Sequence, residues 1–190
     1  MSDENGQVEP AERVVKTGIE AQMEHVEFDY KQLTAREFAE IDKVKSQTGL
    51  FITSLLAHVV KICPKSWGDP ADVKTWRKLP MFGVCVPLFA KFSSVIGALP
   101  DEIEGIVYNL DEVTADEYES AAAKFRSSAS IHEKALGLTR VVKSCPGIDD
   151  PASLDCWLDA PFYTVFIPAH KGYGAEAMRQ LTNFLKQFGS

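Results

Sequence analysis

The sequence lacks a continuous apolar stretch long enough to cross a membrane as a helix, which takes about 20 residues. The longest candidate, from Met81 to Ala90, is too short. There is also no excess of basic residues: 20 Lys and Arg stand against 27 Asp and Glu, a formal net charge of −7. Nonspecific nucleic-acid binding depends on such an excess. The N-terminus has no signal-peptide pattern. We therefore expect a cytoplasmic protein with no membrane or nucleic-acid partner.

Residues that commonly carry chemistry are few and scattered. The four cysteines form no Cys-x-x-Cys pair, whereas a structural zinc site needs four ligands at workable spacing. The histidines are His25, His58, His132 and His170, and no nucleophile with an orienting partner is marked near any of them. Gly172-Tyr173-Gly174 lacks the glycine spacing and the Lys of a phosphate loop, and we interpret it as a hinge between two helices. These absences predict no catalytic residue, metal or cofactor, so the protein is not expected to be an enzyme.

What the sequence does contain is one pattern written twice. Val59-Val60-Lys61-Ile62-Cys63-Pro64 returns 82 residues later as Val141-Val142-Lys143-Ser144-Cys145-Pro146. Thr34-Ala35-Arg36-Glu37-Phe38 returns 80 residues later as Thr114-Ala115-Asp116-Glu117-Tyr118. Agreement in order, spacing and residue type predicts an internal duplication. The structural anchors of the repeat are Thr34, Glu37, Cys63, Asp69, Pro70, Trp76, Pro80 and Pro87, matched by Thr114, Glu117, Cys145, Asp150, Pro151, Trp157, Pro161 and Pro168.

The duplication predicts a mostly α-helical protein made of two pseudo-symmetric units of about eighty residues. We expect a flexible tail over residues 1–24, unit 1 over 25–98, a connector over 99–105 and unit 2 over 106–190. A unit of this size has a marginal core by itself, so the halves are expected to pack together. Val26–Tyr30 and Ile106–Leu110 are candidates for a short leading strand in each unit, and for pairing with each other; an extended lead-in is the alternative.

Capping signals predict where the helices begin. Thr34-Ala35-Arg36-Glu37 and Thr114-Ala115-Asp116-Glu117 both fit the capping box, in which Thr and Glu satisfy each other's backbone amides. The helices that they open are expected to run to about Ser46 and Ser127. The sequence thus predicts matched helices at the start of both units.

The next helix of each unit is predicted from its apolar stripe, and a short helix follows it. Phe51, Leu55, Val59 and Ile62 recur at the helical interval, and Pro64 and Pro146 are expected to end the helix in the two units. Asp69-Pro70 and Asp150-Pro151 then place a cap residue before a proline at the first helical position. The short helices that start there are expected to carry Trp76 and Trp157 into the core.

The last segment of each unit has two interpretations. Met81 to Ile96 reads as an apolar helix kinked at Pro87, because proline lacks a donor and collides with the preceding turn. The alternative is a short strand at residues 82–86 with a helix starting at Pro87, and residues 162–167 offer the same choice. A terminal amphipathic helix is predicted last, with Met178, Leu181, Phe184 and Leu185 on its buried side.

Aromatic residues and methionine concentrate in these last segments, which are apolar nearly all round. The residues are Met81, Phe82, Phe89, Phe92, Phe162, Tyr163 and Phe166. One interpretation is that they are buried between the two halves. The alternative is an apolar surface that binds an amphipathic helix or another copy of the chain. Cys63 and Cys145 are interpreted as small buried residues.

The order of these features resembles the tail assembly chaperones of long-tailed bacteriophages. The resemblance is carried by an extended lead, Leu33-Thr34-Ala35-Arg36-Glu37-Phe38, an apolar helix, a Trp-bearing helix, Leu79-Pro80 and a last apolar helix. It covers Val26 to about Ile96, and again Val107 to Phe188. The tandem copy departs from the single-unit form expected of that family, so that the two halves can differ in function.

The resemblance implies a non-enzymatic helical chaperone that works in the host-cell cytoplasm. Such a protein shields the tape-measure protein and helps to recruit tail-tube subunits, so its partner would be a helical client of that kind, with a homo-oligomer as a further expectation. The alternative function is a small phage regulatory or inhibitory protein that binds a host enzyme complex. The two differ in the partner that would copurify with the chain.

Overall fold

The computed structural model describes residues 18–111, 114–124 and 128–188. It is mostly helical, as predicted. In the first half the elements are α1 (Gly18–Glu24), β1 (Glu27–Phe28), α2 (Ala35–Asp42), α3 (Thr48–Val59), β2 (Val60–Ile62), α4 (Val73–Lys78), the π-helical turn η1 (Met81–Cys85) and α5 (Val86–Gly97). In the second half they are β3 (Val107–Tyr108), α6 (Ala115–Lys124), α7 (Ile131–Val141), β4 (Val142–Ser144), α8 (Leu154–Leu158), the π-helical turn η2 (Phe162–Phe166) and α9 (Ile167–Phe188).

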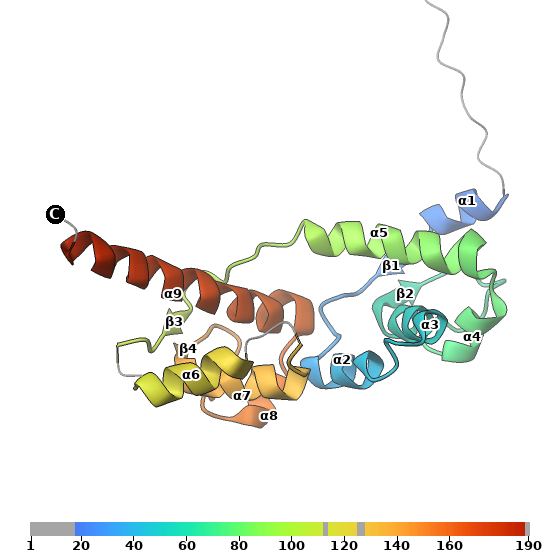
Figure 1. Ribbon diagram of the computed structural model, residues 1–190. Coiled ribbons are helices and arrows are strands. Elements are labelled where there is room, and N and C mark those ends of the chain that lie inside the picture. Colours follow the sequence, from blue (N-terminus) through green and yellow to red (C-terminus); the bar gives the residue numbers. More distant parts are fainter. Residues whose placement is uncertain (1–17, 112–113, 125–127, 189–190) are drawn as a thin grey trace, which may run out of the picture.

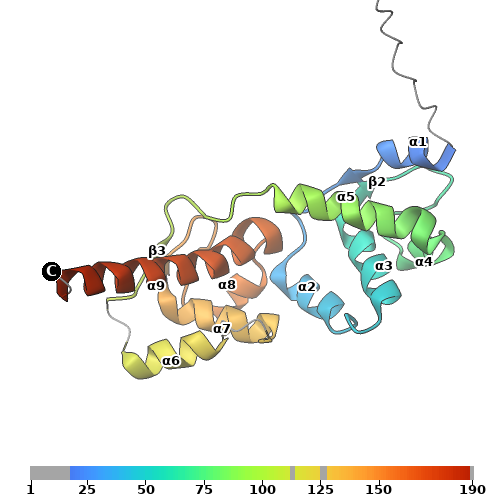
Figure 2. The ribbon, with the colours of Figure 1, turned by 45° about the horizontal axis from the view of Figure 1, so that its top comes forward.

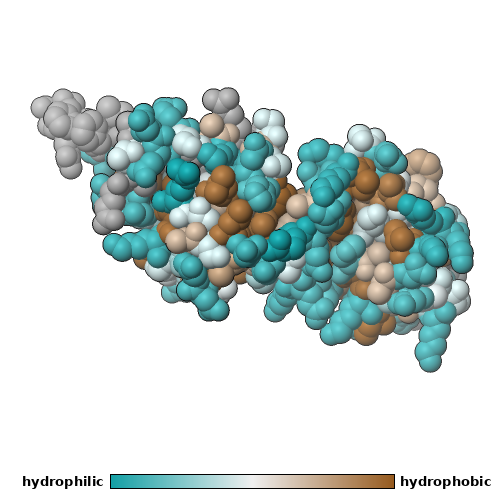
Figure 3. Space-filling model, turned by 90° about the horizontal axis from the view of Figure 1, so that it is seen from below, coloured by the Kyte–Doolittle hydropathy of each residue, from teal (hydrophilic) through white to brown (hydrophobic). Residues whose placement is uncertain are grey.

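The helices form an elongated molecule with two groups. Figure 1 shows α3, α4 and α5 at one end and α6 to α9 at the other, with α2 between them. Figure 2 shows the same arrangement after rotation. Viewed from below, the molecule consists of two bodies joined across a narrower waist, with brown apolar areas scattered among hydrophilic side chains (Figure 3). The placement of α2 between the two groups is the feature that connects them.

The short strands pair within each half. β1 pairs antiparallel with β2, with Glu27 opposite Ile62, and β3 pairs with β4, with Val107 opposite Ser144. The expected pairing of Val26–Tyr30 with Ile106–Leu110 is therefore wrong. α3 and α7 also end at Val59 and Val141, earlier than at Pro64 and Pro146. The β-branched residue that follows each helix adopts an extended conformation, which suits β-branched side chains and leaves the next residues free to form the ladder.

The capping boxes at Thr34 and Thr114 are confirmed. Each Thr hydroxyl accepts from the backbone N–H of its Glu, whose carboxylate accepts from the backbone N–H of the Thr. α2 ends at Asp42, short of Ser46, and the residues that follow it form turns. Ser127, the expected end of the matching helix, lies outside the described residues. A third box, formed by Ser130 and Glu133 at the start of α7, was not predicted.

The Asp-Pro pairs do not open the short helices. Asp72 and Ser153 are the N-caps of α4 and α8, three residues later than predicted. Asp69 and Asp150 instead accept from the backbone N–H two residues on and form turns.

Each of these turns holds the tryptophan that follows it. The Nε1–H of Trp76 donates to the Pro70 carbonyl at 2.7 Å, and that of Trp157 donates to the Pro151 carbonyl at 2.8 Å. Both indoles are completely buried. The turn therefore supplies the hydrogen-bond partner that a buried indole needs.

The segments at Met81 and Phe162 are helical, so the strand alternative is wrong. Each begins with a π-helical turn, closed by bonds from the N–H of Val86 to the Met81 carbonyl and from that of Ile167 to the Phe162 carbonyl. Pro87 and Pro168 follow directly. A proline within an α-helix clashes with the carbonyl four residues earlier, and the wider turn gives that ring more space.

α9 is continuous through Gly172-Tyr173-Gly174, so the predicted hinge is wrong. Tyr173 is buried, and the hydroxyl of Tyr108 lies only 2.5 Å from where a Cβ on Gly172 would be. This glycine thus permits close packing. Further along, Met178 is 63% exposed, contrary to prediction. The side chains of Leu181, Phe184 and Leu185 lie outside the described part of the structure.

Two clusters of buried residues form the core. One lies within the first half and surrounds Trp76. The larger one surrounds Trp157 in the second half and also includes Leu33, Ala35 and Ile41 from the first half. The expected packing between the halves occurs in this second cluster.

The end of the expected flexible tail is helical. Residues 18–24 form α1, which is held by a hydrogen bond from Trp67 Nε1 to Gln22 Oε1 at 3.0 Å and by one from Lys91 Nζ to the Met23 carbonyl at 3.2 Å. Residues 1–17 of that tail lie outside the described residues.

The two helical glycines of α9 give a matched test of this packing. We expect Gly172→Ala to lower the free energy of unfolding by about 1–3 kcal/mol, because the new methyl group overlaps the Tyr108 hydroxyl. Gly174→Ala has open space and should instead stabilise the protein by about 0.5–1 kcal/mol through helix propensity. Urea unfolding of both variants checks this, and Tyr108→Phe should largely rescue Gly172→Ala. Equal effects of the two glycine substitutions would contradict the close approach.

Candidate functional site

The start of α2 is held on a corner of the second half. Thr34 and Pro161 form an isolated antiparallel bridge. The Ala35 N–H donates to the Ala160 carbonyl at 2.9 Å, and the Phe162 N–H donates to the Leu33 carbonyl at 2.7 Å. This corner lies between α8 and η2, and we call it the closed corner; it consists of Asp155, Asp159, Ala160, Pro161, Phe162 and Tyr163. The chain therefore contains one complete contact between the start of a helix and a corner of this kind.

Charge fixes the orientation of α2 on the closed corner. Arg36 Nη2 lies 2.8 Å from Asp155 Oδ1, and Arg36 Nε lies 2.8 Å from Asp159 Oδ1. The hydrogen bonds that Arg36 donates to these carboxylates raise the pKa of Arg36 further above its ordinary value. All three side chains are substantially exposed, and exposed ion pairs contribute little to stability. Their main effect is to define which face of the helix meets the corner.

Aromatic packing completes the contact. The rings of Phe38 and Phe162 stack with centroids 3.8 Å apart and planes 11° apart. Tyr163 meets Phe38 edge-on at 6.1 Å and Phe92 at 5.5 Å. Such pairs contribute about 0.5–1.5 kcal/mol each beyond the area they bury. Apolar contact therefore carries the affinity of this docking.

The residues predicted to bind a partner fall into three groups of exposure. Phe92, Phe162 and Phe166 are buried. Met81, Phe89 and Tyr163 are partly exposed. Phe82 is 85% exposed, so it is the member of this set that offers a whole aromatic ring to a partner.

Phe82 belongs to a second corner, between α4 and η1. We call this the open corner and define it as Lys74, Lys78, Leu79, Pro80, Met81 and Phe82. Both lysines are exposed. For the Leu79 carbonyl and the Met81 N–H, no hydrogen bond is found within the described residues. The backbone turns here at Pro80 with φ −59° and ψ 120°, close to the φ −55° and ψ 119° of Pro161.

An apolar groove lies between the halves. It has a volume of about 200 Å³, below the 300 Å³ at which small-molecule sites begin. Its lining residues are Phe38, Phe51, Leu55, Phe89, Phe92, Ser93, Ile96 and Tyr163. A groove of this size and character fits one or two apolar side chains of a polypeptide.

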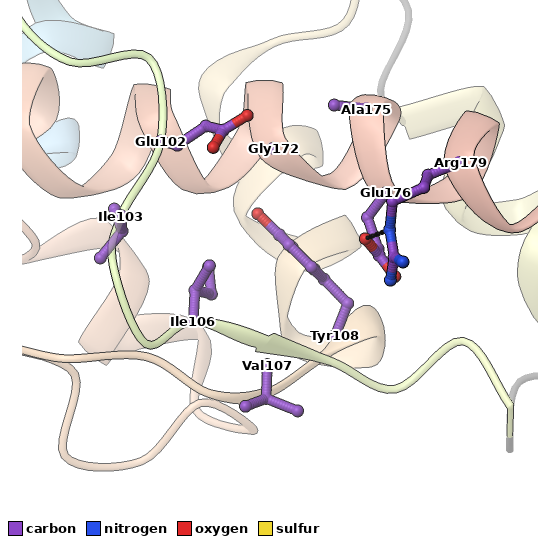
Figure 4. Close-up of a pocket in the computed structure, with 9 residues that line it drawn as sticks. All are labelled: Glu102, Ile103, Ile106, Val107, Tyr108, Gly172, Ala175, Glu176 and Arg179. Carbon is purple, nitrogen blue, oxygen red and sulfur yellow. Dashed lines mark hydrogen bonds and ion pairs between the residues drawn. The ribbon is translucent and has the colours of Figure 1, made fainter.

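A larger cavity, of about 480 Å³, lies between α9 and the segment around β3 (Figure 4). The Tyr108 side chain points from β3 toward α9, and its hydroxyl donates to the Ala169 carbonyl at 2.8 Å. Burial raises the pKa of Tyr108. The Glu176 carboxylate accepts a hydrogen bond from the Arg179 guanidinium, and this bond lowers the pKa of Glu176. The Tyr108 hydroxyl and the Glu176 carboxylate are thus held in structural contacts, and neither is poised as a general base.

Three of the thiols are less acidic than an ordinary cysteine. Burial raises the pKa of Cys63 and Cys85, and that of Cys145 to about 11, which keeps these thiols protonated and weakly nucleophilic near neutral pH. Cys145 is buried and Cys63 partly so. Across the described ranges, no three His, Cys, Asp or Glu residues gather in a way that could hold a metal ion.

Comparison with protein-family models, with curated proteins and with solved structures found no match. Among the residues that the structure describes, no helix has the length and apolar character that a membrane crossing requires. The functional assignment therefore rests on the two corners and the groove.

Phe38 and Phe82 test the difference between the two corners. Phe38→Ala should lower the free energy of unfolding by about 2 kcal/mol, because it removes a stacked ring from the closed corner. Phe82→Ala should change it by less than about 0.5 kcal/mol, because that ring is exposed. Chemical denaturation followed by circular dichroism measures both. A large loss of stability in Phe82→Ala, measured on the dilute monomer, would show that the open corner is covered within one molecule.

We expect His170 to make the folding stability of the protein depend on pH. Burial, with a smaller effect of Lys134, lowers the pKa of His170 from 6.5 to about 4. Below pH 6.5 the unfolded chain binds a proton that the folded chain does not, so stability is full above that pH and is lost as pH falls toward 4. Between about pH 7.5 and 4.5 the melting temperature of the natural sequence should therefore fall further than that of His170→Phe. The exposed His132 serves as control, and His132→Gln should retain the original pH dependence.

Proposed function

We propose that this chain is a non-enzymatic assembly protein that holds an amphipathic helix of a client polypeptide in its apolar groove. The groove itself is the observation that supports this most directly. All but one of its lining residues are apolar, and it is too small for a typical small-molecule ligand. Helix-in-groove binding uses apolar anchors spaced along one helix face. A phage tail assembly chaperone, with a tape-measure helix as the client, is the specific role that we propose.

We infer that the fold behind this function is one unit duplicated in tandem. The two Asp-Pro turns hold their tryptophans by the same bond, and both π-helical turns precede a proline. Phe28 packs on Phe92 at 5.4 Å and 54°, and Tyr108 packs on Tyr173 at 6.1 Å and 59°. These paired local geometries support the duplication, and they indicate that each unit offers the same kind of surface to a helix.

Two neighbouring serines on α5 allow a matched test. Ser93 lines the groove and Ser94 does not, and both are exposed. Ser93→Glu places a charge among apolar groups, where a carboxylate is unfavourable, and should weaken capture of tape-measure helical segments at least about tenfold. Ser94→Glu should leave binding unchanged. The measurement is a titration of fluorescent peptides that span those segments.

Either of two results would refute the proposal. One is that the natural sequence binds none of the tape-measure segments at low salt, where charge and apolar contacts are both available. The other is that Ser93→Glu and Ser94→Glu bind equally well. A host enzyme complex recovered as the dominant partner from cells would instead favour the inhibitor function.

A further inference from the structure

We propose that the open corner binds the N-terminal end of α6 from a second copy of this chain, so that copies join head to tail. The contact would repeat between molecules the docking that α2 makes with the closed corner inside one molecule. This goes beyond the proposed client binding, because the open corner and the apolar groove share no residue.

The two corners correspond residue by residue. Leu79, Pro80, Met81 and Phe82 stand 81 positions before Ala160, Pro161, Phe162 and Tyr163. In the closed corner the Ala160 carbonyl and the Phe162 N–H bind the residues around Thr34. The matching Leu79 carbonyl and Met81 N–H have no such partner within the described part of the chain. A docking helix would satisfy both groups, as the bridge at Thr34 does.

Exposure of the aromatic ring agrees with a missing partner. Tyr163 is covered by Phe38 and Phe92. Phe82 occupies the matching position and is 85% exposed. A large ring on a surface with unpaired backbone groups is typical of an interaction site. The open corner is therefore the surface that a helix of the α2 type would cover.

The charges at the open corner indicate which helix binds there. Arg36 of α2 pairs with Asp155 and Asp159 of the closed corner. At the open corner the positions of the two aspartates are taken by Lys74 and Lys78, and on α6 the position of Arg36 is taken by Asp116. All three side chains are exposed. Both signs are reversed, so that α6 suits the open corner and α2 suits the closed one.

The N-terminus of α6 is capped in the same way as the N-terminus of α2. Thr114 and Glu117 form the same capping box as Thr34 and Glu37. α6 packs on α7 of its own half, and Asp116, Glu117 and Glu119 remain exposed. The start of α6 thus offers the same capped entry that the closed corner accepts from α2.

The contact cannot form within one molecule. α6 and α4 lie at opposite ends of the molecule in both Figure 1 and Figure 2. A contact between two different surfaces at opposite ends is heterologous, and it builds a ring if the rotation closes or a filament if it does not. Self-association should therefore continue past the dimer as concentration rises.

Charge reversal tests the pairing. Asp116→Lys and the double variant Lys74→Glu/Lys78→Glu should each self-associate at least about tenfold more weakly than the natural sequence. Mixed in equal amounts they should assemble again, because each variant then meets a partner of opposite charge at both ends. Sedimentation velocity over a range of concentrations measures this, and assembly of the natural sequence should weaken with added salt.

The controls separate charge pairing from general effects. Lys61→Glu/Lys65→Glu changes the net charge equally at exposed sites outside the corner and should assemble normally. Phe82→Glu should stop assembly, and no charge variant should restore it. The proposal is overturned if the natural sequence stays monomeric up to about 1 mM, if the charge variants assemble normally, or if the mixture fails to assemble. Binding of client peptides by Ser93 and Ser94 variants is read separately, so the two proposals fail independently.

Discussion

The docking of α2 on the closed corner is the interaction that makes this chain one structure. Leu33, Ala35 and Ile41 complete the core around Trp157, so the second half lacks part of its core without a helix from the first. A half of a 190-residue chain buries too little surface to be very stable alone. The two backbone bonds at Ala160 and Phe162 set the register of the contact, and the ring of Phe38 stacks on that of Phe162.

Proline shapes each corner. Pro80 and Pro161 stand between a short helix and a π-helical turn with ψ near 120°, so the helix cannot continue. The carbonyl before each proline and the N–H after it take no part in the helical hydrogen bonds of the described residues. In the closed corner α2 binds those groups. The buried tryptophan behind each corner is held by the carbonyl of the preceding Asp-Pro turn. Rigid surroundings of this kind reduce the conformational entropy lost when a helix binds.

The local features of this fold could be predicted from the sequence, and the connections between its elements could not. The capping boxes at Thr34 and Thr114 depend on residues three apart, so a short pattern suffices. The pairing of β1 with β2 depends on contacts more than thirty residues apart, and the Asp-Pro signal was outweighed by Asp72 and Ser153. Gly172 predicted a break because the sequence does not show the Tyr108 ring that packs against it. The exposure of Phe82, and hence the open corner, likewise required the three-dimensional arrangement.

The opposite charges of the two corners would keep two similar contacts apart. If the open corner carried two aspartates at the positions of Lys74 and Lys78, α2 of another copy would fit that open corner as well as it fits its own closed corner. The helices could then exchange between molecules, which is a common failure of proteins built from more than one folded part. Because the open corner carries lysines, the positive Arg36 would be repelled there. The negative Asp116 would be repelled by the aspartates of the closed corner. Exposed ion pairs add little stability, but a repulsive pair rejects the wrong partner. The sign reversal thus separates the contact that folds the chain from the contact proposed to join its copies.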